Sequence, residues 1–284
     1  MKNHNIESNI ENEKKNEKNE KNEKKLESNY NLKIKRKILW CIQILFLVIL
    51  IITGVEIIKW FIDKEDNNKI LNSIEQTVTV VNKESDKNEI DKEKSENTKK
   101  QYEVDFSQLK QINDETVAWI KVNNTKIEYP IVKTTDNSYY LTHNFEKKSN
   151  KAGWIFADYK NKFDGTDKNI VVYGHNMRDD SMFGSLKSVI NEEWYNNEEN
   201  KYITFITEEE NTTYEVFSVY QIEREENYIQ TSFKQNQFDR FIRTIKERSV
   251  KDFNVEITSE DSILTLSTCA NNNKYRVVLH AKKI

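Results

Sequence analysis

The residue types best suited to covalent chemistry stand at the ends of short β-rich runs. Cys269 follows the apolar run 263–268, where the chain leaves for the polar loop ANNNKY. Strand ends that open into loops are common places for catalytic groups. A cysteine without a disulfide partner is buried and inert, joined to another chain, or kept as a thiol for chemistry. Cys269 taken alone leaves all three roles open.

A histidine and an arginine are candidates for the groups that a reactive thiol needs. His175 directly follows the run 169–174, so it also stands at a strand end. Arg276 lies at the start of the run 275–281, seven residues after Cys269. If this run is the antiparallel neighbour of the strand that ends at Cys269, Arg276 returns close to the cysteine. Either residue could equally be structural, with Arg276 in a surface ion pair.

Together the three residues form a constellation suited to acyl transfer. A cysteine thiol has a pKa of about 8.5 when unperturbed, and it reacts as the thiolate. A guanidinium at Arg276 would favour the thiolate and hold a developing oxyanion. An imidazole at His175 would give a proton to the leaving amine. The sequence shows no metal-ligand cluster of suitable spacing and no Gly-rich phosphate loop, so we expect no metal and no cofactor.

The elements that must position these residues are mainly short strands. Clusters of Asn, Asp, Gly, Lys and Glu separate eight β-rich runs, at 119–122, 127–132, 153–158, 169–174, 202–207, 214–222, 263–268 and 275–281. Three helical patterns accompany them, at Phe106, Leu109 and Ile112, at 181–189, and at Phe238, Phe241, Ile242 and Ile245. We therefore expect one domain over residues 102–284, a β-barrel or sandwich with inserted helices.

The average composition describes a soluble, weakly acidic protein. The mean hydropathy is -0.84 and the formal net charge is -3. With 36% hydrophobic residues the chain cannot be a polytopic membrane protein. The charge also argues against a nucleic-acid partner held by bulk positive charge. Two cysteines are too few for a disulfide scaffold or a four-Cys zinc site.

One segment departs strongly from that average. Residues 38–58 read ILWCIQILFLVILIITGVEII, long enough at about 1.5 Å per residue to cross a bilayer core of roughly 30 Å. A cleaved signal peptide is disfavoured because the apolar run is too long and no A-x-A-like site follows. We expect a single-pass anchor that binds the membrane through residues 38–58. Cys41 lies inside this span, so the membrane separates it from Cys269.

The flanks of the span predict its orientation. Four basic residues precede it, namely Lys33, Lys35, Arg36 and Lys37. Asp63, Lys64, Glu65 and Asp66 follow it. The positive-inside rule then puts the N-terminus in the cytoplasm and the C-terminal domain outside the cell. Residues 1–37 are expected to be a charged tail, disordered or at most a frayed helix. Residues 59–101 are expected to be an extracellular spacer.

Three segments in order resemble the sortases, and the class B group in particular. They are the sequence TLSTC at 265–269 with Arg276 after it, DNSYYLTHNFEKKSNKAGWIFADYKN at 136–161, and YGHNMRDDSMFGSL at 173–186. The resemblance covers roughly residues 102–284. It implies a closed, mostly eight-stranded β-barrel with an N-terminal helix and an inserted helix before the penultimate strand. It also agrees with the expected membrane topology.

The resemblance implies a cell-wall transpeptidase of Gram-positive bacteria. Such an enzyme cuts a C-terminal sorting signal of a secreted protein after a Thr, holds the acyl group as a Cys thioester, and passes it to an amine of the lipid-linked peptidoglycan precursor. By motif, Cys269 is the nucleophile, His175 the general acid and base, and Arg276 the oxyanion or substrate-orienting group. The implied substrate-binding residues are Asn137, Leu141, Tyr173, Ser267, Thr268, Tyr228 and Ile229.

Two departures from the family pattern, a competing histidine and two other functions remain open. Family members often carry an acidic or polar residue after the cysteine, where this chain has Ala270, and the loop from Cys269 to Arg276 is short and Asn-rich. His143 competes with His175 for the histidine role. The same catalytic residues would also serve a membrane-anchored cysteine peptidase of the thiol protease kind, a hydrolase that gives the acyl group to water. A non-catalytic surface binding protein on the same barrel is the remaining alternative.

Overall fold

The computed structural model describes residues 2–81, 101–234, 236–269 and 274–284, and it divides the chain into two compact units. The first unit is Met1–Phe61 and the second is Ile62–Ile284. Helix α1 (Lys2–Glu75) forms the first unit and continues into the second. Within the first unit it is long and apolar enough to cross a membrane, by length and composition. The apolar side chains of residues 38–58 are exposed along it.

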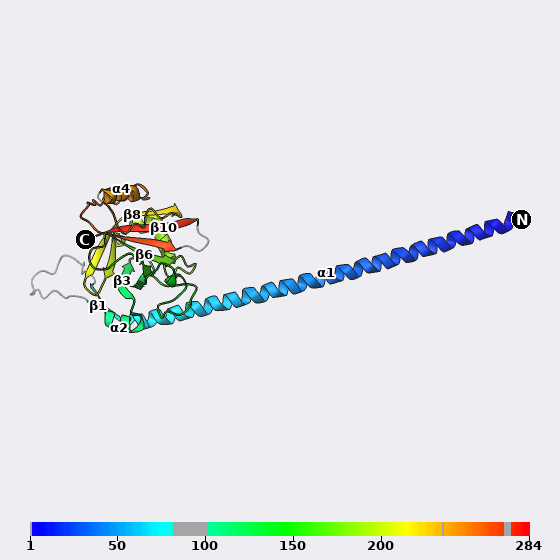
Figure 1. Ribbon diagram of the computed structural model, residues 1–284, viewed down its shortest axis with the longest axis horizontal. Helices are drawn as coiled ribbons and strands as arrows, with labels where there is room; N and C mark the ends of the chain where they lie inside the picture. Colours follow the sequence, from blue (N-terminus) through cyan, green and yellow to red (C-terminus); the bar gives the residue numbers. More distant parts are fainter. Residues whose placement is uncertain (1, 82–100, 235, 270–273) are drawn as a thin grey trace, which may run out of the picture. The chain divides into compact units, whose positions relative to one another are not determined.

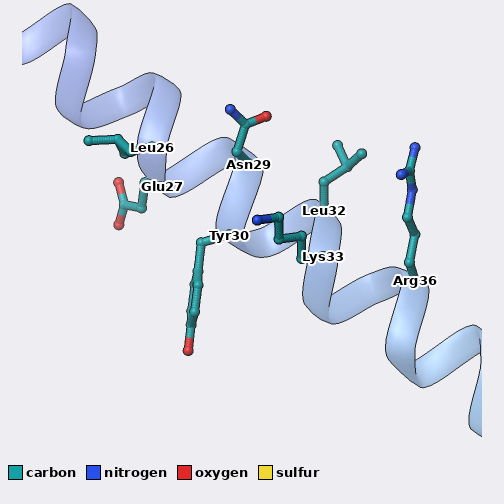
Figure 2. A pocket seen from close by; sticks show the side chains of 7 residues that line it. All are labelled: Leu26, Glu27, Asn29, Tyr30, Leu32, Lys33 and Arg36. Atoms are coloured by element: carbon teal, nitrogen blue, oxygen red, sulfur yellow. The ribbon is translucent and has the colours of Figure 1, made fainter.

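The charged N-terminal segment is helical in the structure. The sequence left open a disordered tail or a frayed helix, and α1 follows the helical alternative. Glu20 and Lys24 of this segment have the i, i+4 spacing that stabilises a helix. Figure 2 shows seven side chains between Leu26 and Arg36. All seven belong to this one helix, so the hollow among them is a surface feature of α1.

The second unit begins well before the boundary that composition suggested. The sequence placed residues 59–101 in a spacer, yet Ile70 and Ile74 of α1 are buried in the hydrophobic core of this unit. After α1, strand β1 (Val78–Val81) pairs antiparallel with β2 (Gln101–Val104). The sequence did not predict this two-stranded sheet. Most of the expected spacer, residues 82–100, lies outside the described part of the chain.

The main structure of the second unit is a closed eight-stranded barrel (Figure 1). Its strands are β3 (Thr116–Val122), β4 (Glu128–Val132), β5 (Phe156–Ala157), β6 (Asn169–His175), β7 (Tyr202–Ile206), β8 (Asn211–Glu223), β9 (Ile263–Cys269) and β10 (Tyr275–Lys283). Their order around the barrel is β10-β8-β7-β3-β4-β5-β6-β9. The eight expected runs are therefore confirmed as strands. Closure leaves no unpaired edge among these eight.

Two of the barrel's pairings are parallel, and both join strands that are not hairpin partners. β4 pairs with β5 in parallel, and β6 pairs with β9 in parallel along seven residue pairs. β9 and β10 form an antiparallel pair, as the sequence suggested. The β-branched and aromatic residues of these strands fill the core, for example Ile120, Val171 and Ile263, each with 0% exposure.

The helices follow their sequence patterns in most positions, although Ile112 of the first pattern is exposed. α2 (Phe106–Ile112) buries Phe106 and Leu109, and the carboxylate of Asp105 caps it by accepting from the Gln108 amide. The pattern expected at 181–189 forms a 3-10 helix, η2 (Gly184–Ile190). The remaining short elements are η1 (Tyr139–Leu141), α3 (Glu192–Tyr195) and η3 (Glu198–Lys201).

Helix α4 (Gln237–Glu247) lies between β8 and β9 in the chain and packs on the barrel (Figure 1). The four apolar residues of its predicted face are all buried: Phe238, Phe241, Ile242 and Ile245. Ser218 of β8 donates a hydrogen bond to the carbonyl of Ile245 at 2.6 Å. The ring of Phe241 lies edge-on to His280 of β10, with centroids 6.3 Å apart. This is the inserted helix that was expected before the penultimate strand.

Candidate active site

The register of three neighbouring strands brings the three candidate catalytic residues into one row. In the parallel pair β6–β9, His175 is the partner of Cys269. In the antiparallel pair β9–β10, Val278 is the partner of Ser267, and the same register continued by two residues puts Arg276 opposite Cys269. Partners directly across a sheet share one face. The side chain of Cys269 and the loop 270–273, with Ala270, lie outside the described part of the structure.

The imidazole of His175 is held by the backbone of a neighbouring segment. The residue is buried, with 7% exposure, and its Nε2 donates a hydrogen bond to the carbonyl oxygen of Leu141 at 2.7 Å. The donor must be nitrogen, since a carbonyl oxygen accepts only. Gly153 allows this close approach: its φ is +60°, and a Cβ there would lie 3.1 Å from His175 Cδ2 and 2.3 Å from the Tyr140 oxygen.

Arg276 lies on β10, which pairs with β9 on the side away from β6. It is the second residue of β10 and pairs with Ile222 of β8. The side chain is half-buried, and its Nη1 donates to the carbonyl of Tyr275 at 3.1 Å. The adjacent Val277 amide donates to Thr268 Oγ1 at 3.0 Å, which ties β10 to the residue before Cys269. The guanidinium therefore belongs to the same end of the barrel as the cysteine and the histidine.

The competing histidine lies on a different segment. His143 is half-buried and stacks on Tyr139, with ring centroids 4.0 Å apart and an interplanar angle of 5°. Its Nδ1 contacts the Tyr139 carbonyl oxygen at 2.8 Å. His143 forms an isolated bridge with Ser149, whereas His175 is the residue in register with Cys269.

Three expected substrate-binding residues lie on the His175 side of the row. Leu141 touches His175 through its carbonyl. The Asn137 side-chain amide donates to Asp158 Oδ2 at 2.8 Å, and the Tyr173 hydroxyl donates to the same oxygen at 2.8 Å. The structure thus brings Asn137 and Tyr173 together at a buried carboxylate that the sequence analysis did not single out.

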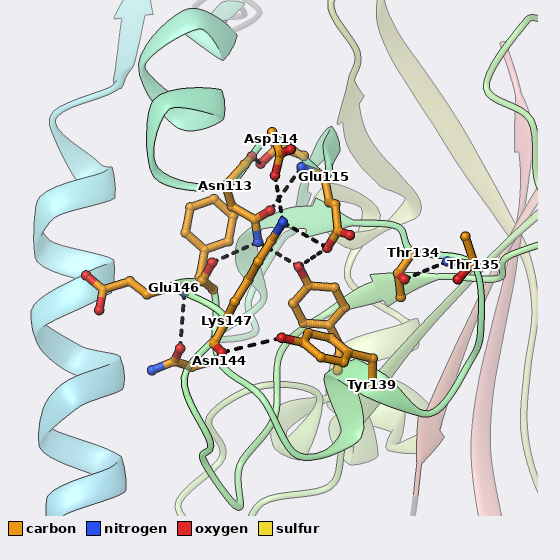
Figure 3. Close-up of polar contacts among 12 residues, drawn as sticks. Asn113, Asp114, Glu115, Thr134, Thr135, Tyr139, Asn144, Glu146 and Lys147 are labelled. Atoms are coloured by element: carbon orange, nitrogen blue, oxygen red, sulfur yellow. Dashed lines mark hydrogen bonds and ion pairs between the residues drawn. The ribbon is translucent and has the colours of Figure 1, made fainter.

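The segment that carries Leu141 is anchored by a polar cluster around η1 (Figure 3). Asn113 donates from its amide nitrogen to the Tyr140 hydroxyl at 2.8 Å, and that hydroxyl donates to the carboxylate of Glu115. Burial raises the pKa of the Tyr140 phenol above its ordinary value. Lys147 lies 2.6 Å from Asp114, and this contact lowers the pKa of the Asp114 carboxyl. The cluster fixes the position of the carbonyl that His175 contacts.

The other four expected substrate-binding residues gather on the β9 side. Ser267 and Thr268 are buried, at 2% and 1% exposure. The hydroxyl of Tyr228 lies 3.0 Å from Ser267 Oγ, so the loop after β8 reaches the strand that ends in Cys269. Ile229 is half-buried and packs against the core. The structure therefore places this loop beside the strand that ends in Cys269.

The relatives of this chain are consistent with one family. A family model for the sortase domain matches residues 120–284. The chain is 37% identical to sortase B of Listeria monocytogenes over 182 residues, which is 62% of this chain and 72% of the relative. It is 30% identical to sortase B of Staphylococcus aureus over 253 residues, covering 88% of this chain and 98% of the relative.

The similar solved structures are also sortases of class B. A crystal structure of sortase B from Bacillus anthracis has a TM-score of 0.64 and 35% identity, covering 79% of this chain and 99% of the other. A Staphylococcus aureus sortase B–substrate complex and a sortase B complexed with triglycine each have a TM-score of 0.60 and 34% identity. Each covers 63% of this chain, and 84% and 85% of its own chain. The chain belongs to the sortase family. Within that family it is a class B sortase, a cysteine transpeptidase.

Proposed function

We propose that this sortase cleaves the C-terminal sorting signal of secreted proteins after a Thr and transfers the acyl group to an amine of the cell-wall precursor. In this proposal Cys269 is the nucleophile, His175 the general acid and base, and Arg276 the group that stabilises the oxyanion. The observation that carries the assignment is the strand register, in which Cys269 pairs with His175 and stands opposite the Arg276 position.

The first half-reaction forms the acyl-enzyme. The Cys269 thiolate attacks the carbonyl carbon of the Thr, and the electron pair moves to the oxygen, where the Arg276 guanidinium stabilises it. The tetrahedral intermediate collapses, the C–N bond breaks, and His175 gives a proton to the leaving amine. The acyl group remains on sulfur as a thioester.

The second half-reaction transfers the acyl group. An acceptor amine attacks the thioester, His175 takes a proton from it, and the thiolate leaves as the new amide forms. Because Nε2 of His175 already donates to Leu141, Nδ1 is the nitrogen expected to exchange this proton. The Leu141 carbonyl would then hold the ring in one orientation throughout the cycle.

The partners follow from the reaction. We infer that the acyl donor is a secreted protein with a sorting motif, bound between the Asn137, Leu141 and Tyr173 side and the Tyr228 and Ile229 side. The acceptor would be an amine of the lipid-linked peptidoglycan precursor. The structural neighbours support this proposal, since one is a sortase B–substrate complex and another is a sortase B complexed with triglycine.

We also propose the domain arrangement. Residues 1–37 are cytoplasmic and 38–58 anchor the protein in the cell membrane. Residues 59–101 lie outside and connect the anchor to the catalytic domain at 102–284, against which the end of α1 packs. The apolar stretch of α1 supports the anchor, because it is long enough to cross a bilayer. An extracellular enzyme at the membrane surface would meet both an exported protein and a lipid-linked amine.

A peptide library presented to the full chain in detergent micelles tests the function. The selected peptide should be cut, and added triglycine should give a new amide product. Cys269→Ala should abolish both products. If triglycine yields no amide while cleavage continues, the enzyme is a peptidase; if Cys269→Ala cleaves normally, the nucleophile is wrong. Ser259→Ala, on the loop before β9, serves as the matched control.

A further inference from the structure

A buried carboxylate joins two of the expected substrate-binding residues. Asp158 directly follows β5 and is 3% exposed. Its Oδ2 accepts hydrogen bonds from the side-chain amide of Asn137 and from the hydroxyl of Tyr173, each at 2.8 Å. Its Oδ1 accepts from the Lys160 amide at 2.9 Å. Two donors from different elements therefore converge on one oxygen atom.

The backbone holds Asp158 firmly in this position. Its own amide donates to the carbonyl of Val171 in β6 at 2.8 Å, and its carbonyl accepts from the Asn161 amide at 3.0 Å. The carboxylate is thus fixed relative to β6, the strand that carries Tyr173 and His175. Hydrogen bonds to a carboxylate are roughly twice as strong as bonds between neutral groups, so the two donors are held tightly.

The carboxylate determines which way the Asn137 amide points. A carboxylate accepts only, so it must face the Nδ2 of Asn137. The opposite side of the amide confirms this orientation, because Oδ1 accepts from the Tyr159 amide at 2.9 Å. One N–H and one lone pair of Asn137 remain for other contacts. Without the Asp158 carboxylate, the Tyr159 N–H would hold the amide from one side only, and the Nδ2 group of Asn137 would lose its fixed acceptor.

We propose that Asp158 is a positioning residue that sets the orientation of Asn137 and Tyr173 toward the bound sorting peptide. This inference rests on the proposed function, and it adds a residue that acts through others rather than on the peptide itself. By accepting from both side chains, its carboxylate oxygen holds Asn137 and Tyr173 in one arrangement. Losing these two hydrogen bonds weakens peptide binding more than it changes the chemistry at Cys269.

Peptide affinity is the measurement that tests this role. The peptide selected by the library is labelled with fluorescein, and its Kd is measured by anisotropy with the full chain carrying Cys269→Ala. Asp158→Asn keeps the shape of the side chain but removes one acceptor position, so the Kd should rise roughly tenfold. In the enzyme with Cys269, the KM should rise by a similar factor, and the rate of Cys269 alkylation by iodoacetamide should stay within about twofold.

Asp167→Asn is the matched control. Asp167 also accepts several hydrogen bonds, from the Lys162 and Phe163 amides and from the Asn161 side chain. Neither Asn137 nor Tyr173 is among these donors. This variant should lose similar bonds and leave the Kd unchanged. If both variants raise the Kd equally, the effect is general loosening of the loop and the positioning role is overturned.

A double-mutant cycle separates positioning from folding. Asn137→Ala and Tyr173→Phe should not be additive with Asp158→Asn, because all three act through one oxygen atom. Additive effects would overturn the proposal.

If Asp158→Asn fails to fold, Asn137→Ala and Tyr173→Phe are combined with each other, and additive effects of these two substitutions on the Kd overturn the proposal equally. If no library peptide binds the unsubstituted chain, the proposed function falls and this inference with it; equal Kd values in Asp158→Asn remove this inference alone.

Discussion

At the residue scale, His280 is part of a buried hydrogen-bond network that reaches the loop beside the site. It is fully buried in β10, with its Nε2 2.8 Å from the Tyr220 hydroxyl and its Nδ1 2.9 Å from Thr265 Oγ1. Thr265 donates its hydroxyl hydrogen to Asn169 Oδ1, so the Nδ1 of His280 must carry the proton. Asn169 in turn donates to the carbonyl of Gln230. A single chain of hydrogen bonds thereby reaches the loop that carries Tyr228.

That chain requires a neutral imidazole and makes stability depend on pH. Burial, with a smaller effect of the Arg248 charge, lowers the pKa of His280 to about 3. The unfolded chain binds a proton near the ordinary value of about 6.5, whereas the folded chain does not. The contribution is therefore complete above about pH 6.5, and it is lost as pH falls from there toward 3, at up to about 1.4 kcal/mol per pH unit.

We expect His280→Gln to remove this part of the pH dependence. Denaturant unfolding of the full chain between pH 4.5 and 7.5 measures it, as the difference between the two proteins. A Gln can donate to Thr265 and accept from Tyr220, so the network itself is preserved. Parallel curves for wild type and variant across that range would contradict a neutral buried His280.

The candidate catalytic positions could be marked from the sequence at this scale, whereas Asp158 could not. Cys269, His175 and Arg276 each stand near the end of a strand that a β-rich run between polar clusters marks clearly. Asp158 lies in a similar position, but its role depends on Asn137 and Tyr173, which come from two other segments. The pattern of residue types along the sequence does not show which side chains from separate segments come into contact after folding.

At the scale of elements, the end of α1 belongs to the catalytic unit. Asn67 and Asn150 exchange side-chain hydrogen bonds at 3.1 and 3.5 Å, and Asn150 also donates to the carbonyl of Asp63 at 2.9 Å. The Lys151 amide donates to the Asp63 carboxylate at 3.1 Å. These contacts support the loop that leads to Gly153, which packs against the His175 ring.

Removing the end of α1 should therefore destabilise the barrel. Burial of Ile70 and Ile74 contributes about 3 kcal/mol or more, at roughly 1.5–3 kcal/mol for each fully buried side chain. A chain that begins at Tyr102 should melt at a lower temperature than a chain that begins at Ile62. Circular dichroism melting curves compare the two, with Asn68→Ala, an exposed neighbour on the same helix, as the control. Equal midpoints would show that residues 62–101 are a spacer after all.

The strands could be read from the sequence, but this helix end could not. Short runs rich in β-branched and aromatic residues, each bounded by polar clusters, recur along the domain and mark the strands clearly. Residues 62–75 contain few apolar side chains among many charged ones, which is also the composition of a solvated linker. The burial of Ile70 and Ile74 depends on the core residues of the barrel unit that they contact, and these residues are distant in sequence.

At the scale of the whole molecule, the proposed topology depends on four basic residues before the span. The positive-inside rule predicts that Lys33, Lys35, Arg36 and Lys37 keep the N-terminus in the cytoplasm. Replacing all four by Gln should produce chains of mixed orientation. Trypsin added to intact cells, followed by immunoblotting of the catalytic domain, measures the exposed fraction.

The control replaces four lysines farther from the span with Gln, namely Lys14, Lys15, Lys18 and Lys21. They contribute less to the rule because their distance from the membrane is greater. Complete protection of the catalytic domain in unmodified cells would contradict the outward orientation. Unchanged exposure after both replacements would show that other features set the topology.

The parallel pairing of β6 with β9 has a consequence for when the enzyme becomes active. His175 and Cys269 are distant in sequence, and they meet only through this pairing. Contacts between distant segments form late, because the intervening chain must first be ordered. During refolding, the thiol should therefore reach its final rate of alkylation only after tryptophan fluorescence has reached most of its native value. An enzyme of this design becomes active only once its barrel has closed, because β6 and β9 must pair before His175 lies beside Cys269.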